Sequence, residues 1–168
     1  VLKENLGHYI NLYDIWSSYR VESDGILIAY TSVYGHTKKA VELLAEKLEA
    51  KGQKVVVADL ARDDMAEAVE DAFRYGKLVL ATTTYNGDVF PFMKEFIHHL
   101  TERNYQNRTV AFMENGSWMP TAVKVMKNML EQSKNLTLAE PAVTVLSALN
   151  ETSRTQIASL ADALCAAE

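Results

Sequence analysis

Apolar positions along the chain follow two different periods, which predict a regular succession of strands and helices. Short runs that are almost wholly apolar or β-branched are typical of strands buried on both faces of a parallel sheet. Such runs cover residues 26–31, 54–59, 78–83, 109–114 and 142–146. Between them, apolar residues recur every three or four positions, which indicates helices with one buried face. These helices are expected near residues 40–51, 64–73, 91–100, 122–130 and 153–164.

Local end signals support these helices. Lys51-Gly52 places a cation and then a glycine at the end of one helix, and Pro91 suits the first turn of another. Ser153 and Gln156 have the spacing of a capping box at the start of the last helix. Five strand–helix units predict the α/β class: a doubly wound, three-layer αβα sandwich around a five-stranded parallel sheet. Ligands of such folds bind beyond the carboxyl ends of the strands.

The first 20 residues have a separate helical pattern. Leu2, Leu6, Tyr9, Ile10 and Tyr13 lie on one face of a helix, and the segment Ser23-Asp24-Gly25 ends the pattern. We therefore expect residues 1–22 to be a helical lead-in and residues 23–168 to be the domain. Because the sequence starts at Val1 and not at methionine, we also expect it to be part of a longer protein.

The segment 31–37 follows the first strand and leads directly into a helix, which indicates a phosphate-binding loop. Ser32 and Thr37 offer neutral hydroxyl donors, and Gly35 allows a tight turn. The candidate residues are Ser32, Val33, Tyr34, Gly35, His36 and Thr37. With no lysine in the loop and no G-x-G-x-x-G pattern, the triphosphate and dinucleotide loops are excluded. The alternative is an ordinary turn with a Ser/Thr cap.

Two further loops, after the third and fourth strands, carry candidate binding residues. The first offers Thr83, Thr84, Tyr85, Asn86 and Gly87, and its Asn-Gly pair favours a turn with positive φ. The second offers Asn115, Gly116, Ser117 and Trp118. A tryptophan in a polar loop suggests stacking on a flat ligand. The alternatives are a plain turn for the first loop, and for the second a Trp118 packed on the helix that follows.

Composition limits the classes of function. A length of 168 residues with 48% hydrophobic content suits one domain, and a net charge of −5 argues against a nucleic-acid partner. The single cysteine, Cys165, excludes an internal disulfide and a cysteine-based metal cluster. No apolar run approaches the ~18 residues of a membrane span, and no signal peptide is recognisable, so a cytoplasmic location is expected. His98-His99 is interpreted as surface.

The spacing Ser32-x-Tyr34-Gly35-x-Thr37 resembles the S-x-[TY]-G-x-T phosphate loop of flavodoxins. With the other two loops, the resemblance covers about residues 25–167 and is of the short-chain type. It implies strand order 2-1-3-4-5 and noncovalent FMN, with its phosphate on residues 32–37 and its ring between the other two loops. It also implies that a peptide beside Gly87 flips to accept a hydrogen bond from the reduced flavin. Asp88 or Glu114 is then a candidate for lowering the flavin potential.

The segment from Leu6 to Tyr19 resembles the helix that joins the two domains of flavodiiron proteins, also called A-type flavoproteins. This resemblance implies an electron-transfer domain, the flavin half of an oxygen or nitric oxide reductase. A rubredoxin-like protein or a flavin reductase would donate electrons, and the diiron domain of the parent protein would accept them across a homodimer. The family's iron ligands are absent from this chain, and Met119-Pro120 replaces a glycine-rich stretch of many relatives.

Three rival interpretations remain at this stage. A flavodoxin-like NAD(P)H:quinone reductase would be an enzyme in its own right, although such proteins often carry insertions that this chain lacks. A phosphoacceptor receiver domain would need acidic residues after the first strand and at the end of the third, where Thr31-Ser32 and Thr82-Thr83 stand here. A flavin-free interaction module of the same fold is the third.

Overall fold

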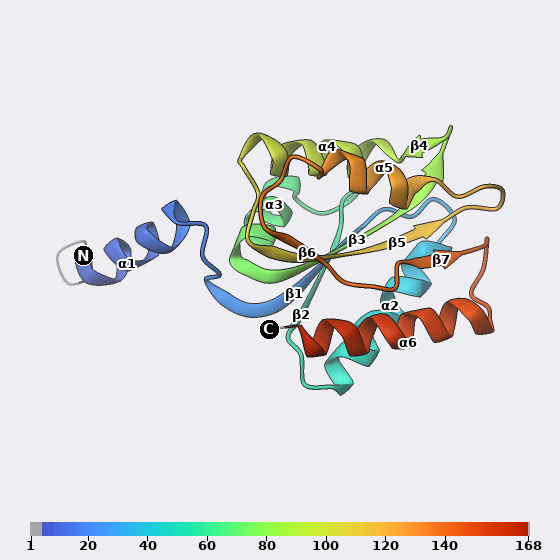
Figure 1. Ribbon diagram of the computed structural model, residues 1–168, viewed down its shortest axis with the longest axis horizontal. Coiled ribbons are helices and arrows are strands. Elements are labelled where there is room, and N and C mark those ends of the chain that lie inside the picture. The colour runs from blue at the N-terminus through green and yellow to red at the C-terminus, as the bar shows by residue number, and fades with distance from the viewer. Residues whose placement is uncertain (1–4, 168) are drawn as a thin grey trace.

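A computed structural model describes residues 5–167 as a three-layer α/β sandwich (Figure 1). The parallel strands are β1 (Ser23–Tyr30), β2 (Val55–Asp59), β3 (Tyr75–Tyr85), β5 (Arg108–Asn115), β6 (Leu136–Leu138) and β7 (Val143–Val145). One face of the sheet is covered by α2 (His36–Ala50) and α6 (Glu151–Ala166). The other is covered by α3 (Met65–Arg74), α4 (Pro91–Glu102) and α5 (Ala122–Met129).

The strand order confirms the predicted topology. The order is β2-β1-β3-β5, and both β6 and β7 pair with β5 at the outer position, which corresponds to 2-1-3-4-5. The strand count differs from the prediction, because the fifth strand is split into β6 and β7. Pro141 lies between the two pieces and has no N–H to donate to the ladder. The predicted run 142–146 corresponds to β7, and β6 was not expected.

The core is divided by the sheet into two layers. Alternate residues of one strand face opposite sides, so Leu27 packs with α3 and α4 whereas Ile26 and Ile28 pack with α2 and α6. This explains why the central strands read as continuous apolar runs. Met93 and Met126 are fully buried in the layer with α3 and α4, as core methionines usually are.

The helix ends confirm two expected signals and correct a third. Gly52 follows α2 with φ of 81°, and Pro91 is the first residue of α4. The predicted capping box at Ser153 and Gln156 is wrong, because α6 begins earlier. Asn150 caps the helix, and its side chain accepts from Ser153 N while Ser153 Oγ accepts from Asn150 N. Gln156 instead accepts a hydrogen bond from Thr144 N.

Helix α1 (Leu6–Ser17) projects from the sandwich at the end where β1 begins (Figure 1). None of its residues is buried, and the predicted apolar face of Leu6, Tyr9, Ile10 and Tyr13 is 49–72% exposed. Leu2, the other predicted member of that face, lies outside the described residues. Over residues 5–167, no helix combines the length and the apolar character that crossing a membrane requires.

Candidate functional site at the carboxyl edge of the sheet

The three predicted loops meet at the carboxyl edge of the sheet, where β1, β3 and β5 end (Figure 1). Three threonines in a row at the end of β3 make the connections. Thr82 Oγ1 lies 2.7 Å from Thr31 Oγ1, and Thr83 Oγ1 lies 3.2 Å from Thr37 Oγ1 at the start of α2. These pairs join the first loop to the second.

Thr84 joins the second loop to the third. Its Oγ1 accepts hydrogen bonds from Thr121 N at 3.1 Å and from Ala122 N at 3.3 Å, which are free donors at the start of α5. Thr121 Oγ1 in turn donates to Gly87 O. The Thr84 hydroxyl therefore braces two loops, and its contact with a ligand stays a prediction.

The first loop has the donor set of an anion site. Gly35 has φ of 85° at the start of α2, and Ser32 Oγ accepts from Gly35 N and Lys38 N. Within residues 5–167, the backbone N–H groups of positions 33, 34, 36 and 37 have no intramolecular partner. Unpaired N–H groups at a helix N-terminus suit a phosphate group. The loop thus fits the phosphate of a nucleotide held by neutral donors.

The second loop is a tight hairpin between β3 and β4 (Asp88–Val89), which pairs antiparallel with the end of β3. Asn86 and Gly87 have φ of 49° and 75°, as the Asn-Gly pair predicts. Tyr85 stays half-exposed, and its ring meets Phe90 edge-on at 5.6 Å between centroids. Phe90 therefore covers part of the Tyr85 ring, and the exposed part is open to a ligand.

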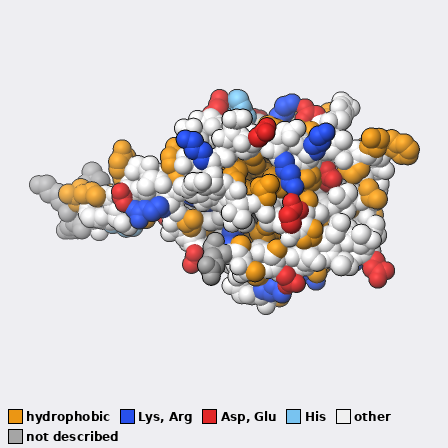
Figure 2. Space-filling view, in the orientation of Figure 1, with side chains coloured by type: hydrophobic (Ala, Val, Ile, Leu, Met, Phe, Trp, Pro, Cys, Tyr) orange, Lys and Arg blue, Asp and Glu red, His pale blue; other side chains and the backbone are white. Residues whose placement is uncertain are grey.

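The third loop holds an exposed tryptophan on a compact backbone. Gly116 N donates to Val145 O, and a Cβ on Gly116 would lie 3.1 Å from Pro120 Cβ. Met119 has φ of 44°, and Trp118 is 84% exposed. A Trp118 packed on the following helix is therefore ruled out. Figure 2 shows apolar side chains at the end of the molecule where this loop turns.

Both acidic residues of these loops already have partners. Glu114 is buried, and its carboxylate accepts from Val123 N at 2.8 Å and from Thr144 Oγ1 at 3.0 Å. Asp88 pairs with Lys94, and this hydrogen bond holds the pKa of the Asp88 carboxyl below its ordinary value. Glu114 therefore connects β5 to α5 and to the outer strand. With both carboxylates paired, the loops present a largely neutral surface.

The predicted binding residues leave out four residues that shape this edge: Thr31, Thr82, Thr121 and Ser147. The first two stand where a predicted strand runs into a predicted loop, and they were given no contact of their own. Ser147 follows β7, and its carbonyl accepts from Asn115 Nδ2 at 3.2 Å. The available signal was the rule that all carboxyl ends of parallel strands share one edge, which brings in the loop after the last strand as well.

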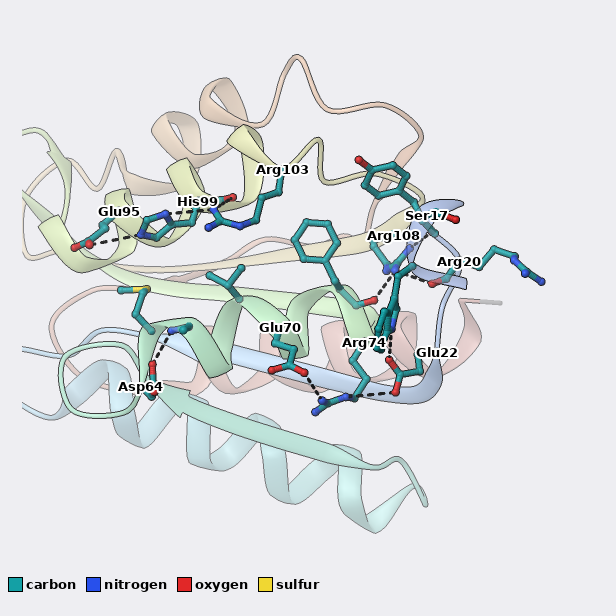
Figure 3. Close-up of a pocket in the computed structure, with 16 residues that line it drawn as sticks. Ser17, Arg20, Glu22, Asp64, Glu70, Arg74, Glu95, His99, Arg103 and Arg108 are labelled. Carbon is teal, nitrogen blue, oxygen red and sulfur yellow. Dashed lines mark hydrogen bonds and ion pairs between the residues drawn. The ribbon is translucent and has the colours of Figure 1, made fainter. Parts of the chain in front are cut away.

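Two other features lie away from this edge. His98 and His99 lie on α4, beside Glu102 and Glu95, and in the described part of the chain His, Cys, Asp and Glu form no metal-binding group of three. A hollow of about 780 Å³ lies between α3, α4 and the segment after α1 (Figure 3). Residues of the three loops do not line this hollow.

Comparisons with known proteins place this geometry in a family. A family model described as "Flavodoxin domain" matches residues 27–163. The anaerobic nitric oxide reductase flavorubredoxin of Escherichia coli O1:K1 is 22% identical over 135 residues. That alignment covers 79% of this chain, and the chain spans only 28% of the length of such curated relatives.

Solved structures share the fold at low sequence identity. Rubredoxin oxygen:oxidoreductase from Desulfovibrio gigas is 16% identical with a TM-score of 0.87, covering 95% of this chain and 39% of its own. A flavo di-iron protein from Thermotoga maritima is 17% identical with a TM-score of 0.82, covering 97% and 40%. The flavodoxin of Streptococcus pneumonia TIGR4 is 19% identical with a TM-score of 0.72, covering 86% and 99%.

The coverage distinguishes these neighbours at the N-terminus. A match over 97% of 168 residues leaves only about five residues out, so it includes most of α1. The match to the flavodoxin leaves out several times as many residues. The fold shared with the flavo di-iron protein therefore extends beyond the sandwich to the projecting helix.

Proposed function

We propose, on the premise that this chain belongs to the flavodoxin domain family, that it binds FMN and serves as an electron-transfer domain. The observation that carries the proposal is the meeting of three loops at one edge of the sheet. One loop offers unpaired N–H donors, and the other two present Tyr85 and Trp118 to solvent. An anion cradle beside exposed aromatic rings suits a ligand with a phosphate at one end and a flat ring at the other.

In this proposal, the segment 32–37 would hold the phosphate through its backbone N–H groups and hydroxyls. The segments 83–87 and 115–118 would hold the sugar-like chain and the ring, with Trp118 or Tyr85 on a face of the ring. FMN, when bound, supplies the exchange of one or two electrons. The chain itself contributes binding, orientation and a neutral environment, since Glu114 and Asp88 are already paired.

We further propose that the chain is the flavin part of a larger protein of the flavodiiron type, with residues 1–22 as its lead-in. Two findings support this: the chain spans 28% of its curated relatives, and the structural match to the flavo di-iron protein includes most of α1. The electron donor would be a rubredoxin-like protein or a flavin reductase, and the acceptor a diiron domain.

The geometry of the domain favours a homodimer for this transfer. Helix α1 leaves at the amino edge of the sheet, whereas the proposed site lies at the carboxyl edge. The eight residues of β1 between them span about 25 Å. A domain carried on α1 would therefore lie far from the flavin of its own copy, so a second copy would supply the acceptor.

The test is equilibrium binding of FMN, riboflavin and FAD to the purified chain, followed by flavin fluorescence and by the visible spectrum. We expect FMN to bind on the order of 100-fold more tightly than riboflavin, which lacks the phosphate. Thr37→Val should weaken FMN more than riboflavin, because Thr37 lies in the phosphate loop and its bond to Thr83 reaches the second loop as well. Thr155→Val, on the exposed side of α6, is the matched control.

The outcomes separate the rival functions. A chain that binds no flavin overturns the electron-transfer proposal and leaves an interaction module. Steady NAD(P)H oxidation with a quinone would instead indicate a reductase that is an enzyme on its own. An electron carrier should instead take up electrons in a reductive titration of its FMN complex and show no steady NAD(P)H oxidation.

A further inference from the structure

The segment that joins α1 to the sheet is held by a buried guanidinium. Arg108, the first residue of β5, is 3% exposed. Its Nη1 donates to Tyr19 O at 2.7 Å, and its Nη2 donates to Arg20 O at 3.2 Å. Figure 3 shows Arg108 beneath this segment, next to Ser17 and Arg20. Both carbonyls lie in the five-residue segment, residues 18–22, that links α1 to β1.

The remaining donors of Arg108 fix the surroundings of that link. They bind the carbonyls of Phe73 at 2.6 Å and Tyr75 at 3.0 Å, where α3 ends and β3 begins. Nη1 also donates to the carbonyls of Gln106 and Asn107 just before β5, so one of its two N–H groups is shared between two acceptors. One side chain therefore joins three separate segments through six carbonyl oxygens, and it has no donor left for a ligand.

The end of α1 has a backbone conformation that needs such support. Tyr19 has φ of 55°, in the left-handed region that a bulky residue rarely adopts. Tyr19 N donates to Trp16 O and Arg20 N to Ile15 O, the pattern of a Schellman cap, where glycine is the usual residue. A tyrosine persists there only when its surroundings hold it. The Arg108 bond to Tyr19 O and the nearby Phe73 ring, 6.4 Å between centroids, provide that hold.

Two more contacts tie the same segment to α3. Glu22 N donates to Arg74 O at 3.0 Å. The Glu22 carboxylate accepts from Trp16 Nε1 at 2.7 Å. It also faces the Arg74 guanidinium, as Figure 3 shows. Trp16 at the end of α1 is thus joined to the domain through one side chain and not only through the backbone.

We propose that Arg108 is the positioning residue that fixes the direction in which α1 leaves the sheet, so that α1 is a rigid arm of the domain. The anchoring rests only on the contacts above and needs no flavin. Its consequence rests on the proposed function: a diiron domain carried on α1 would be held in one orientation relative to the flavin site.

The experiment uses Trp16 as its reporter, in the Trp118→Phe background, because these are the only two tryptophans of the chain. Time-resolved anisotropy should show Trp16 tumbling with the whole domain. Arg108→Gln should add a fast nanosecond component. In hydrogen exchange, Arg108→Gln should make the amides of Arg20 and Glu22 exchange on the order of 100-fold faster than in the unmutated protein. The amides of α6 in the same sample should show a smaller increase.

Arg103→Gln is the matched control, since Arg103 lines the same hollow but, within residues 5–167, its guanidinium bonds only to His99. It should leave both readouts unchanged. If Arg108→Gln does not fold, Arg108→Lys keeps the charge with fewer donors and should give a smaller change in the same direction. Free motion of Trp16 in the unmutated arm would overturn the proposal, as would a variant in which exchange rises equally in α1 and α6. FMN binding, measured separately, tests the proposed function alone.

Discussion

At the amino edge of the sheet, one buried guanidinium binds six carbonyl oxygens, whereas at the carboxyl edge neutral hydroxyls each make one or two hydrogen bonds. Burial lowers the pKa of the Arg108 guanidinium, yet its many partners keep the charge compensated. The hydroxyls of Thr82, Thr83 and Thr84 carry no charge to compensate.

The difference separates a fixed part of the molecule from an adaptable one. Removing a buried ion leaves many acceptors without partners at once, so the amino edge is expected to fail as a unit. Removing one hydroxyl loosens one connection between loops and leaves the rest. An edge that must admit a ligand is better built from such small, separable contacts. Among residues 5–167, several backbone donors of the first loop have no partner and Trp118 is exposed, as the proposed flavin site requires.

The largest expected effect is that of Arg108→Met on global stability. This change leaves six carbonyls without their donor, and we expect the free energy of unfolding to fall by about 3 kcal/mol or more. Urea denaturation followed by circular dichroism measures it. Arg103→Met should change stability by less than about 0.5 kcal/mol. Equal effects of the two substitutions would contradict the contrast between the edges.

Thr84→Val should have a smaller effect, confined to the carboxyl edge. The substitution keeps the shape but removes the acceptor for Thr121 N and Ala122 N, so we expect a loss of about 1–2 kcal/mol in stability. FMN affinity should also fall, because the second and third loops are no longer joined. Thr84→Ser keeps the oxygen and should restore both properties. If Thr84→Ser lost as much stability and FMN affinity as Thr84→Val, the hydroxyl alone would not account for the connection between the two loops.

Gly87→Ala should cost about 1 kcal/mol of stability, since the residue has φ of 75°. Gly52→Ala is a matched control: its φ is 81°, and like Gly87 it has open space where a Cβ would stand. Both variants should therefore lose similar stability, by urea denaturation. Only Gly87→Ala should also shift the one-electron potentials of bound FMN, measured by reductive titration. Unchanged potentials would remove the predicted role of the peptide beside Gly87.

Much of this architecture was predictable from the sequence, because each element depends on local pattern. The continuous apolar runs of β1 and β3 reflect burial on both faces, and the Asn86-Gly87 pair by itself predicts its turn. The three loops converge because parallel strands end at one edge. The split of the outer strand was less accessible, since the short segment 136–138 is partly exposed and has no strong apolar pattern.

The tertiary partners of polar side chains were not predictable. The Oγ1 of Thr84 accepts from N–H groups 37 and 38 residues away, and no local pattern indicates these partners. Nothing in the local sequence distinguishes Arg108 from an exposed arginine, because its partners are backbone carbonyls of distant segments. Similarly, Gln156 has the spacing of a cap, yet it binds Thr144 of β7. Spacing along the chain gives the elements, whereas these contacts depend on how the elements pack.

The smallest expected effect concerns a buried polar group at the amino edge that, unlike Arg108, lacks hydrogen-bond partners among the described residues. Tyr105 lies between α4 and β5, fully buried, and its ring meets Phe73 edge-on at 5.2 Å between centroids. Among the described residues its hydroxyl has no hydrogen-bond partner, and burial raises the pKa of that hydroxyl.

Tyr105→Phe keeps the ring and removes the unpaired hydroxyl, so it should leave stability unchanged or raise it by up to about 1 kcal/mol. Urea denaturation of this variant and of Arg108→Met measures the expected gain and the expected loss of stability at the same edge of the sheet. Tyr30→Phe is the comparison. Because Tyr30 OH donates a hydrogen bond to Asp59, this variant should be less stable than the unmutated protein. A clear loss in Tyr105→Phe would mean that the hydroxyl has a partner in solution, such as a buried water. The amino edge would then depend on more than the bonds of Arg108.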